Sequence, residues 1–518
     1  MIRAFIGYFQ QILVILSFLF IGTTQVIAQP KSNENLPTPV KKALANAKLP
    51  ESALSFSVIR LTNKNNGATV SWQPNASMNP ASTMKLVSTL AALDLLGPQY
   101  RWHTNIYTNG VVHQGVLHGN LYWQGTGDPK LVPEELSKVM AELRSQGINT
   151  INGNLIFDRS AYAPDIKSTA PEDGESQRSY NVSPDPLLYA FQTLSFSIQN
   201  GSGDPEVTYS PHLANLTIDN KLKSAPGSCG DWRKQAKTAV QKVGSNDWTA
   251  SFLGKVPKSC GDIIWNVVAI NADDFLAQGI MAAWEESGGE WKQAPEVQQG
   301  KVPSSAKLLL SHQGATLGDA VKDINKFSNN VMARQVFLTI PLEKVGKPAT
   351  TKDGERIVKE WLKKNQINMP ELVIENGSGL SNIERISTKS MTQLLEYSVK
   401  SKNHELFINS LPIAGTDGTM KNRLIDRLKK VFIGQANAGN TFNPDSSMPA
   451  ALQKTGALIK TGSLAQVRAI SGFVVSQSGQ VYAVASFINH PNAPGGGVSV
   501  QDALLAWLLE DGPEKLRN

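Results

Sequence analysis

Hydrophobic and polar residues alternate near both ends of the chain with the two-residue period of β-strands. Close to the N-terminus, ALSFSVIRL (53–61) and ATVSWQP (68–74) predict two strands joined by a polar, Asn-rich turn. Close to the C-terminus, SGFVVSQSGQVYAVASFIN (471–489) predicts a β-hairpin, and VQDALLAWLLE (500–510) predicts a final helix. We therefore expect one sheet to take strands from both ends of the chain.

Between these ends the period of the pattern changes twice. Residues 81–96 predict an apolar helix, opened by Asn79-Pro80 and closed by Gly97-Pro98. Residues from about 99 to 300 mainly show short strand-like runs separated by Gly, Asn and Pro. From Leu308 onward the period turns helical again, in GATLGDAVKDINKF (314–327), NNVMARQVFL (329–338), KDGERIVKEWLKKN (352–365) and STKSMTQLLEYSVK (387–400).

Strands, then helices, then strands predict an α+β fold in which a helical layer packs against the sheet. The length of 518 residues suggests roughly two to four domains. We expect the sheet-and-helix domain to comprise residues 29–98 and 305–518, and a β-rich insertion to comprise residues 99–304. An inner insertion is expected at about 205–265, the segment that carries both cysteines.

The N-terminus has the features of a signal peptide covering residues 1–28. A short basic start, Met1-Ile2-Arg3, precedes the apolar run Ile12–Gly22, and Val26-Ile27-Ala28 offers a cleavage site. The apolar run is shorter than the span of about 20 residues that a membrane helix needs, although an uncleaved anchor helix is the alternative. We expect an exported protein, located in the periplasm where an outer membrane exists, with at most peripheral membrane association.

Composition narrows the possible partners. Hydrophobic residues make up 41% and charged residues 18% of the chain, which indicates an ordinary globular protein. The net charge of +7 favours mild attraction to anionic surfaces such as cell wall or lipid headgroups. The basic residues are scattered, without an arginine-rich helix or a basic-aromatic platform, which argues against nucleic acid as a partner.

Cysteine and histidine usage argues against a metal site. Cys229 and Cys260 are the two cysteines of the chain, and in an oxidising compartment such a pair favours a disulfide. The seven histidines are dispersed, and no HExxH motif, P-loop or GxSxG elbow occurs. We expect neither a metal nor a cofactor.

Two SxxK motifs place a serine and a lysine three residues apart. Ser304/Lys307 lies in a polar lead into a strand, where nothing holds the pair on one face. Ser82/Lys85 lies on the apolar helix, where the lysine is the one charge before Asp94. Desolvation there lowers the pKa of the lysine and makes it a candidate base for the neighbouring hydroxyl, whereas a snorkelling lysine is the structural alternative. The helix context favours Ser82/Lys85.

Four SxN motifs are candidates for a second serine element. Ser77-Met78-Asn79 is too close to Ser82 to face it, and Ser401-Lys402-Asn403 resembles a solvated turn. Ser179-Tyr180-Asn181 is the serious rival, but it lies in the inserted region. Ser328-Asn329-Asn330 falls at a break between two predicted helices and is favoured.

The tripeptide Lys-Thr-Gly occurs twice, starting at Lys454 and at Lys460. In one strand the two lysines would be about 20 Å apart, so one of them at most can serve a given serine. The first copy follows a polar, Pro-containing lead, and the second is preceded by Ala457-Leu458-Ile459 on a strand predicted to pair with the hairpin. The strand context favours Lys460.

These motifs, in this order, resemble those of penicillin-binding serine DD-peptidases. The gap of 246 residues between Ser82 and Ser328 is similar to that of the class C low-molecular-mass group, the D-Ala-D-Ala carboxypeptidases/endopeptidases of the penicillin-binding protein 4 type. The resemblance spans roughly residues 40 to 510, and further matching segments are GTGDPKL (125–131), ENGSGLS (375–381), LPIAGTDGTMKNR (411–423) and KTGSL (460–464).

The resemblance implies a serine β-lactamase/transpeptidase-like domain and an acyl-enzyme mechanism. Ser82 would be the nucleophile, Lys85 its base, and Ser328 the relay that delivers a proton to the leaving D-alanine. Substrate binding would fall to Asn330, Lys460, Thr461, Gly462 and Ser463, with the N–H groups of Ser82 and Ser463 as the oxyanion hole. The implied partners are peptidoglycan stem peptides and β-lactams.

Two departures from the family pattern leave the preference for the third stem residue open. Asn382 stands where arginine often follows GSGLS, and Ala465 stands where glutamine sometimes follows KTGSL. Two other functions are also open. A β-lactamase would need a base that activates the deacylating water, for which Glu405 in ELFIN (405–409) is a weak candidate, and a wall-binding protein would carry an idle site.

Overall fold

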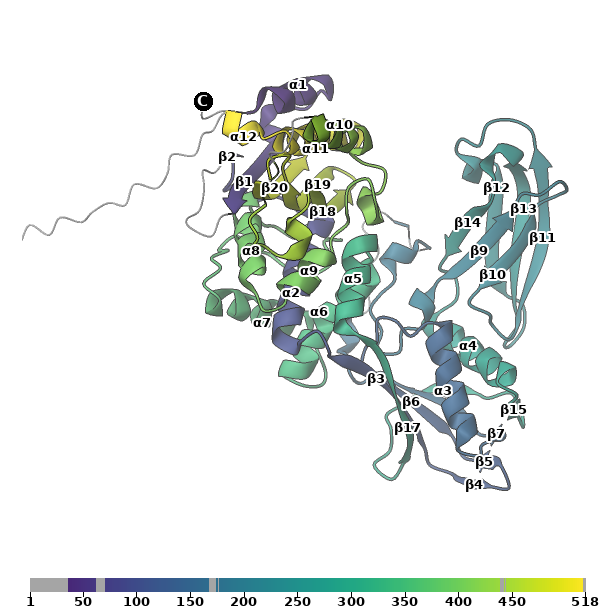
Figure 1. Ribbon diagram of the computed structural model, residues 1–518. Helices are drawn as coiled ribbons and strands as arrows, with labels where there is room; N and C mark the ends of the chain where they lie inside the picture. Colours follow the sequence, from purple (N-terminus) through teal and green to yellow (C-terminus); the bar gives the residue numbers. More distant parts are fainter. Residues whose placement is uncertain are drawn as a thin grey trace, which may run out of the picture.

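The computed structural model describes residues 36–61, 70–166, 174–175, 177–437, 442 and 444–515 (Figure 1). The predicted signal peptide, residues 1–28, lies outside the described residues. Of the helices in the described part of the chain, none combines the length and the apolar character that a bilayer span needs.

One antiparallel sheet takes strands from both ends of the chain, as the alternating pattern predicts. The strand order is β18-β19-β20-β1-β2. These strands are β1 (Leu54–Leu61), β2 (Val70–Trp72), β18 (Gly456–Leu464), β19 (Val467–Val475) and β20 (Val481–Asn489). The first and last strands of the chain pair directly, and the nucleophile candidate follows soon after β2.

Side chains of the central strands alternate between two cores, so both faces of the sheet are covered. Phe473 and Ala483 face the helical layer, whereas Val474 and Tyr482 face the opposite core. The helical layer consists of α2 (Lys85–Leu96), α5 (Leu317–Phe327), α6 (Asn330–Lys344), α7 (Thr351–Lys364), α8 (Thr388–Lys400) and α9 (His404–Asn409). The opposite face is covered by α1 (Thr38–Asn46), α10 (Ile425–Asn437) and α11 (Ala493–Leu509), and the short α12 (Gly512–Lys515) follows α11.

The insertion begins and ends with a pair of antiparallel strands. The first is β3 (Arg101–Thr108) and the last is β17 (Lys307–Thr316). The sheet of the insertion therefore continues to Thr316, past the boundary at residue 304 that the sequence predicted. The difference arises because β17 hydrogen-bonds with β3 along most of its length before the helical period resumes at α5.

Two sheets and two helices make up the part of the insertion next to the helical layer. The sheets have the orders β16-β8-β6-β3-β17 and β15-β7-β5-β4. Their remaining strands are β4 (Val111–His113), β5 (Val116–His118), β6 (Leu121–Gly125), β7 (Thr150–Asn152), β8 (Leu155–Asp158), β15 (Glu290–Trp291) and β16 (Val297–Gln299). The helices α3 (Pro133–Ser145) and α4 (Ala272–Glu286) interrupt a region that the sequence pattern presented mainly as strands.

A second part of the insertion consists of two three-stranded sheets that project away from the central sheet (Figure 1). Their strands are β9 (Leu194–Gln199), β10 (Glu206–Ser210), β11 (Leu216–Ala225), β12 (Ala236–Lys242), β13 (Trp248–Pro257) and β14 (Ile263–Val267). Cys229 and Cys260 form a disulfide here, which confirms the predicted pairing. The strands extend slightly beyond the expected inner insertion of about 205–265.

Candidate active site

Ser82 lies in a short 3-10 turn (Ala81–Met84) that leads into α2, within the predicted helix 81–96. The side chain of Asn79 accepts a hydrogen bond from the Ala81 N–H at 2.8 Å and fixes the start of the turn. Three residues after the serine, Lys85 is fully buried, and its Nζ donates to Ser82 Oγ at 2.9 Å. The structure thus brings the predicted SxxK pair into direct contact.

Two further hydrogen-bond acceptors fix the position of Lys85 Nζ. Nζ donates to Asn330 Oδ1 at 2.6 Å and to the backbone carbonyl of Ser378. Burial holds the pKa of Lys85 well below its ordinary value, and the nearby cations Lys460 and Arg334 lower it further. Burial favours the neutral amine, which has two N–H groups and a lone pair. In that form Lys85 can keep its bonds to Asn330 and Ser378 while the Ser82 hydroxyl donates to Nζ.

Ser328 sits at the junction of α5 and α6, in a left-handed conformation with φ of 58°. The middle residue of the motif, Asn329, caps α6, because its side chain accepts from the Met332 N–H at 3.0 Å. Asn330 is the first residue of α6 and contacts Lys85, as described above. The first and third residues of the motif, Ser328 and Asn330, therefore face the site, and the middle residue, Asn329, caps α6.

Lys460 lies on β18 and connects the sheet to Ser328. Its fully buried Nζ donates to Ser328 Oγ at 2.7 Å and to the Thr461 carbonyl at 2.8 Å. Burial lowers the pKa of Lys460 to about 7. Lys454 of the first Lys-Thr-Gly copy is exposed and precedes the strand, which begins at Gly456. The predicted choice of the second copy agrees with this geometry.

Gly462 allows β18 to approach the backbone of the nucleophile. A Cβ atom at this position would lie 2.9 Å from the Ser82 nitrogen and 2.9 Å from the Pro80 carbonyl oxygen. Because both of these atoms belong to the backbone, neither can move aside without shifting the turn that carries Ser82. The glycine of this Lys-Thr-Gly copy is therefore required by close packing.

We expect Gly462→Ala to slow acylation of Ser82 by about 100-fold, because a displacement of about 1 Å is enough for a loss of that size. Gly456→Ala is the matched control. Gly456 lies on the same strand, but a Cβ atom at that position would meet no other atom within 4 Å. The rate of covalent labelling by a fluorescent penicillin measures both variants. Equal rates for the two would contradict the required close approach.

The outer edge of β18 opens into the site at Thr461. Upstream, the Ala457 carbonyl and the Ile459 N–H point away from β19 and bond with residues 412–414. Backbone groups alternate in direction along an antiparallel strand, so Thr461 and Ser463 turn their N–H and C=O groups the same way. At these two residues the edge lines a cleft and offers backbone hydrogen-bonding groups to an extended ligand.

This cleft has a volume of about 860 Å³. Lys85 and Lys460 lie beneath its wall, each in contact with one of the two serines. The predicted site residues that line it are Ser82, Ser328, Asn330, Thr461, Gly462 and Ser463. All of the catalytic and substrate-binding residues expected from the sequence thus lie at one cleft.

Several residues of the site were not predicted. The segment ENGSGLS was expected only as a family match, yet the backbone carbonyl of Ser378 within it accepts a hydrogen bond from Lys85. Glu384, three residues after this segment, is fully buried beneath it. Two arginines that were not predicted, Arg334 and Arg468, also line the cleft, together with Asn382, which the sequence had already indicated. Local sequence carries no periodic signal for such contacts, because they depend on how distant segments meet.

The competing motifs occupy other places. Lys307 is exposed at the start of β17, and Ser304 is exposed in the turn before that strand. Ser179-Tyr180-Asn181 forms a short turn near the cleft, and the Tyr180 carbonyl accepts from Asn330 Nδ2 at 3.4 Å. The rival motif therefore contributes backbone to the wall of the site while Ser328 contacts Lys460.

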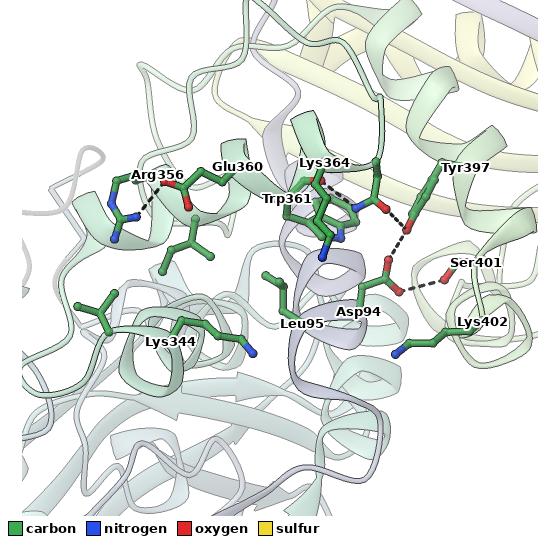
Figure 2. A pocket seen from close by; sticks show the side chains of 13 residues that line it. Asp94, Leu95, Lys344, Arg356, Glu360, Trp361, Lys364, Tyr397, Ser401 and Lys402 are labelled. Carbon is green, nitrogen blue, oxygen red and sulfur yellow. Dashed lines mark hydrogen bonds and ion pairs between the residues drawn. The ribbon is translucent and has the colours of Figure 1, made fainter.

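A second cavity, of about 580 Å³, lies at the opposite end of α2 from Lys85 and is lined by none of the predicted site residues (Figure 2). Asp94 there accepts hydrogen bonds from the hydroxyls of Tyr397 at 2.6 Å and Ser401 at 3.0 Å. Ser401 is buried, so the interpretation of its SxN motif as a solvated turn was wrong. Its hydroxyl holds the carboxylate at the end of the nucleophile helix.

Within the described residues, no group of three or more His, Cys, Asp or Glu side chains could hold a metal ion. The cleft presents two hydroxyls, each paired with a buried lysine, and the outer edge of β18. A hydroxyl activated by a neighbouring amine is suited to acyl transfer.

The chain is similar in sequence to known D-alanyl-D-alanine carboxypeptidases. It is similar to the D-alanyl-D-alanine carboxypeptidase DacB of Haemophilus influenzae, with 25% identity over 448 residues, 85% of this chain and 86% of the relative. It is also similar to the D-alanyl-D-alanine carboxypeptidase of Actinomadura sp. (strain R39), with 27% identity over 451 residues, 83% of this chain and 77% of the relative.

The fold matches as well. The crystal structure of penicillin binding protein 4 from Haemophilus influenzae aligns with a TM-score of 0.67 at 24% identity, covering 91% of this chain and 99% of that one. This likeness confirms the expected α+β architecture. A model of the D-Ala-D-Ala carboxypeptidase 3 (S13) family matches residues 36–438. The chain therefore belongs to the D-Ala-D-Ala carboxypeptidase 3 (S13) family of serine peptidases.

Proposed function

We propose that this D-Ala-D-Ala carboxypeptidase acts through an acyl-enzyme formed on Ser82. The observation that carries the proposal is the contact of 2.9 Å between Lys85 Nζ and Ser82 Oγ at the wall of the cleft. The substrate would be a peptidoglycan stem peptide that ends in D-Ala-D-Ala, and cleavage of cross-links is a further activity that the same chemistry allows.

In the first step, the neutral Lys85 amine takes the proton of Ser82 while Oγ attacks the carbonyl carbon of the penultimate D-alanine. The N–H groups of Ser82 and Ser463 would stabilise the oxyanion, because Ser463 turns its backbone toward the cleft. The tetrahedral intermediate then loses the amide nitrogen, and an ester with Ser82 remains.

The leaving D-alanine needs a proton on its nitrogen. Ser328 can donate its hydroxyl proton to that nitrogen and recover one from Lys460, which contacts it at 2.7 Å. Lys460 and Thr461 would also hold the terminal carboxylate of the substrate, and Asn330 would bind the substrate amide. In deacylation, water attacks the ester carbonyl and its proton passes through Ser328 to Lys460. The departing Ser82 oxygen takes back the proton held by Lys85, so both serines and both lysines return to their initial states.

The exposed edge of β18 supports a defined binding mode for the stem peptide. An extended peptide could pair with the outward N–H and C=O groups of Thr461 and Ser463 and place its scissile bond at Ser82. A β-lactam would enter the same position, with its ring amide in place of the peptide bond. A periplasmic location is proposed from the N-terminal sequence of residues 1–28, which agrees with a cell-wall substrate.

The proposal is tested by incubating the purified protein first with a fluorescent penicillin and then with diacetyl-Lys-D-Ala-D-Ala. Stable label together with D-alanine release from the peptide is the expected result. Rapid loss of the label with hydrolysis of the drug would instead identify a β-lactamase. Absence of both label and D-alanine would identify a protein with an idle site.

Glu405, the candidate base for a β-lactamase, lies away from the cleft. This carboxylate accepts the Ala450 N–H at 2.9 Å and the Asn409 side chain at 3.3 Å, and Glu405 is not among the residues that line the cleft. Its hydrogen bonds hold the α9 region in place. We therefore retain the DD-peptidase as the proposed activity.

A further inference from the structure

A buried carboxylate lies beneath the cleft and is not used by the mechanism above. Glu384 is 0% exposed, and its Oε1 accepts the backbone N–H groups of three consecutive residues, Glu375, Asn376 and Gly377, at 3.0, 3.1 and 3.2 Å. Within the described residues its Oε2 is buried without a hydrogen-bond partner. A carboxylate that binds three successive N–H groups determines the path of that backbone.

The backbone held by Glu384 is the loop that contacts both members of the SxxK pair. The Ser378 carbonyl accepts from Lys85 Nζ. Gly379, with φ of 79°, packs so closely that a Cβ atom would lie 2.0 Å from the Ala81 carbonyl oxygen and 2.7 Å from the Ser82 nitrogen. A shift of this loop would therefore move an acceptor of Lys85 and the support of the Ser82 backbone together.

Glu384 itself is fixed because the two residues that follow it form backbone hydrogen bonds with two other segments. Arg385 exchanges backbone hydrogen bonds with Val373 at 2.9 and 3.0 Å, and Ile386 does the same with Met78 at 3.1 and 3.0 Å. Because the two residues after Glu384 are tied to Val373, just before the loop, and to Met78, just before the turn that carries Ser82, the carboxylate has a fixed position from which to hold residues 375–377.

The charge of Glu384 also acts on Lys85. Lys460 and Arg334 disfavour a proton on Lys85, whereas Glu384 is the anion that favours one and raises the lysine pKa against the effect of burial. Burial raises the pKa of Glu384, and its three N–H bonds and Lys85 oppose that change. The carboxylate is therefore placed to affect both the geometry and the protonation of the base.

We propose that Glu384 is a positioning residue of this enzyme: its carboxylate fixes the 375–379 loop against the start of α2 and thereby holds Lys85 on Ser82. The inference rests on the proposed acyl-enzyme function. Glu384 lies outside the three sequence motifs, and its role has a geometric part and an electrostatic part.

The test compares two substitutions by the pH dependence of acylation with a fluorescent penicillin. Glu384→Gln keeps an oxygen acceptor but removes the charge, so the pKa of Lys85 falls further and the midpoint of the acid limb moves down by about 1 pH unit. Glu384→Asp keeps the charge but shortens the side chain by one methylene, so the acylation rate falls at least tenfold while the midpoint stays.

Glu371→Gln is the matched control. Its carboxylate also accepts a backbone N–H, that of Ser387 at 2.9 Å, but it touches neither Lys85 nor the 375–379 loop. We expect this variant to keep the wild-type rate and midpoint. A merely structural effect of charge removal would change the folded, labelled fraction and leave the midpoint unmoved.

The outcomes distinguish the inference from the function on which it rests. An unlabelled wild-type protein would overturn the acyl-enzyme and this inference with it. Labelled wild type with an unmoved midpoint in Glu384→Gln, or with a wild-type rate in Glu384→Asp, would overturn the inference alone. Should Glu384→Gln fail to fold, the rate of Glu384→Asp decides the geometric role.

Discussion

Replacing Lys85 with alanine is expected to slow acylation of Ser82 by about 1,000-fold, which corresponds to about 4 kcal/mol of transition-state stabilisation. The amine is the group in contact with Ser82 Oγ, and its pKa is lowered by burial, so the variant loses both the base and its alignment. The second-order rate constant for fluorescent-penicillin labelling measures the loss, and D-alanine release from the peptide should fall in parallel.

Lys307→Ala is the control for this prediction, because Lys307 belongs to the competing SxxK motif and is exposed on β17. It should label at the wild-type rate. Retained melting temperature in Lys85→Ala would show that the loss is chemical. A Lys85→Ala protein that acylates within tenfold of wild type would mean that another group takes the proton of Ser82.

The second large effect is expected from Lys460→Ala, which should reduce acylation and peptide hydrolysis by 100-fold or more. The substitution removes the amine that contacts Ser328 Oγ at 2.7 Å and that would bind the substrate carboxylate. Lys454→Ala is the matched control, since Lys454 starts the identical tripeptide six positions earlier but is exposed. It should retain nearly full activity.

The outcome of this pair also tests the strand register. If Lys454→Ala were inactive and Lys460→Ala active, the pairing of β18 with β19 described above would be wrong. Because the pKa of Lys460 is about 7, we further expect binding of a substrate carboxylate to favour its protonated form. Kinetics of the wild-type protein between pH 6 and 8 should therefore report the titration of Lys460.

Much of the central domain could be predicted because its signals are local and periodic. The strands at 54–61 and 481–489 showed a clear two-residue alternation, and they pair directly in the sheet. Lys85 is the one charge before Asp94 in the apolar helix predicted at 81–96. The structure buries this lysine together with the apolar residues around it. The choice between the Lys-Thr-Gly copies followed from strand context, which the structure reproduces at β18.

The parts that could not be predicted depend on contacts between distant segments. Glu384 and Ser378 act at the site through a loop that meets α2 only in three dimensions, so no local pattern indicates them. Ser401 follows a helix and lies among charged residues in the sequence, yet it is buried and its hydroxyl donates to Asp94, far away in the sequence.

The helix α3 has a local signal in the sequence, but the strand-like runs around it are stronger. In α3, Leu136, Val139, Met140 and Leu143 are buried at helical spacing inside a region dominated by strand-like runs. This short amphipathic helix was missed because strand-like runs dominate the sequence around it.

The central claim is that Ser82 carries the acyl group. Mass spectrometry of the penicillin-treated protein, after digestion to peptides, tests it most directly. We predict that the added mass of one penicilloyl group is found on Ser82, within the segment NPASTMK (79–85), and is absent from the same peptide in Ser82→Ala. An adduct on Ser328 or on any other residue, or labelling that persists in Ser82→Ala, would contradict the account.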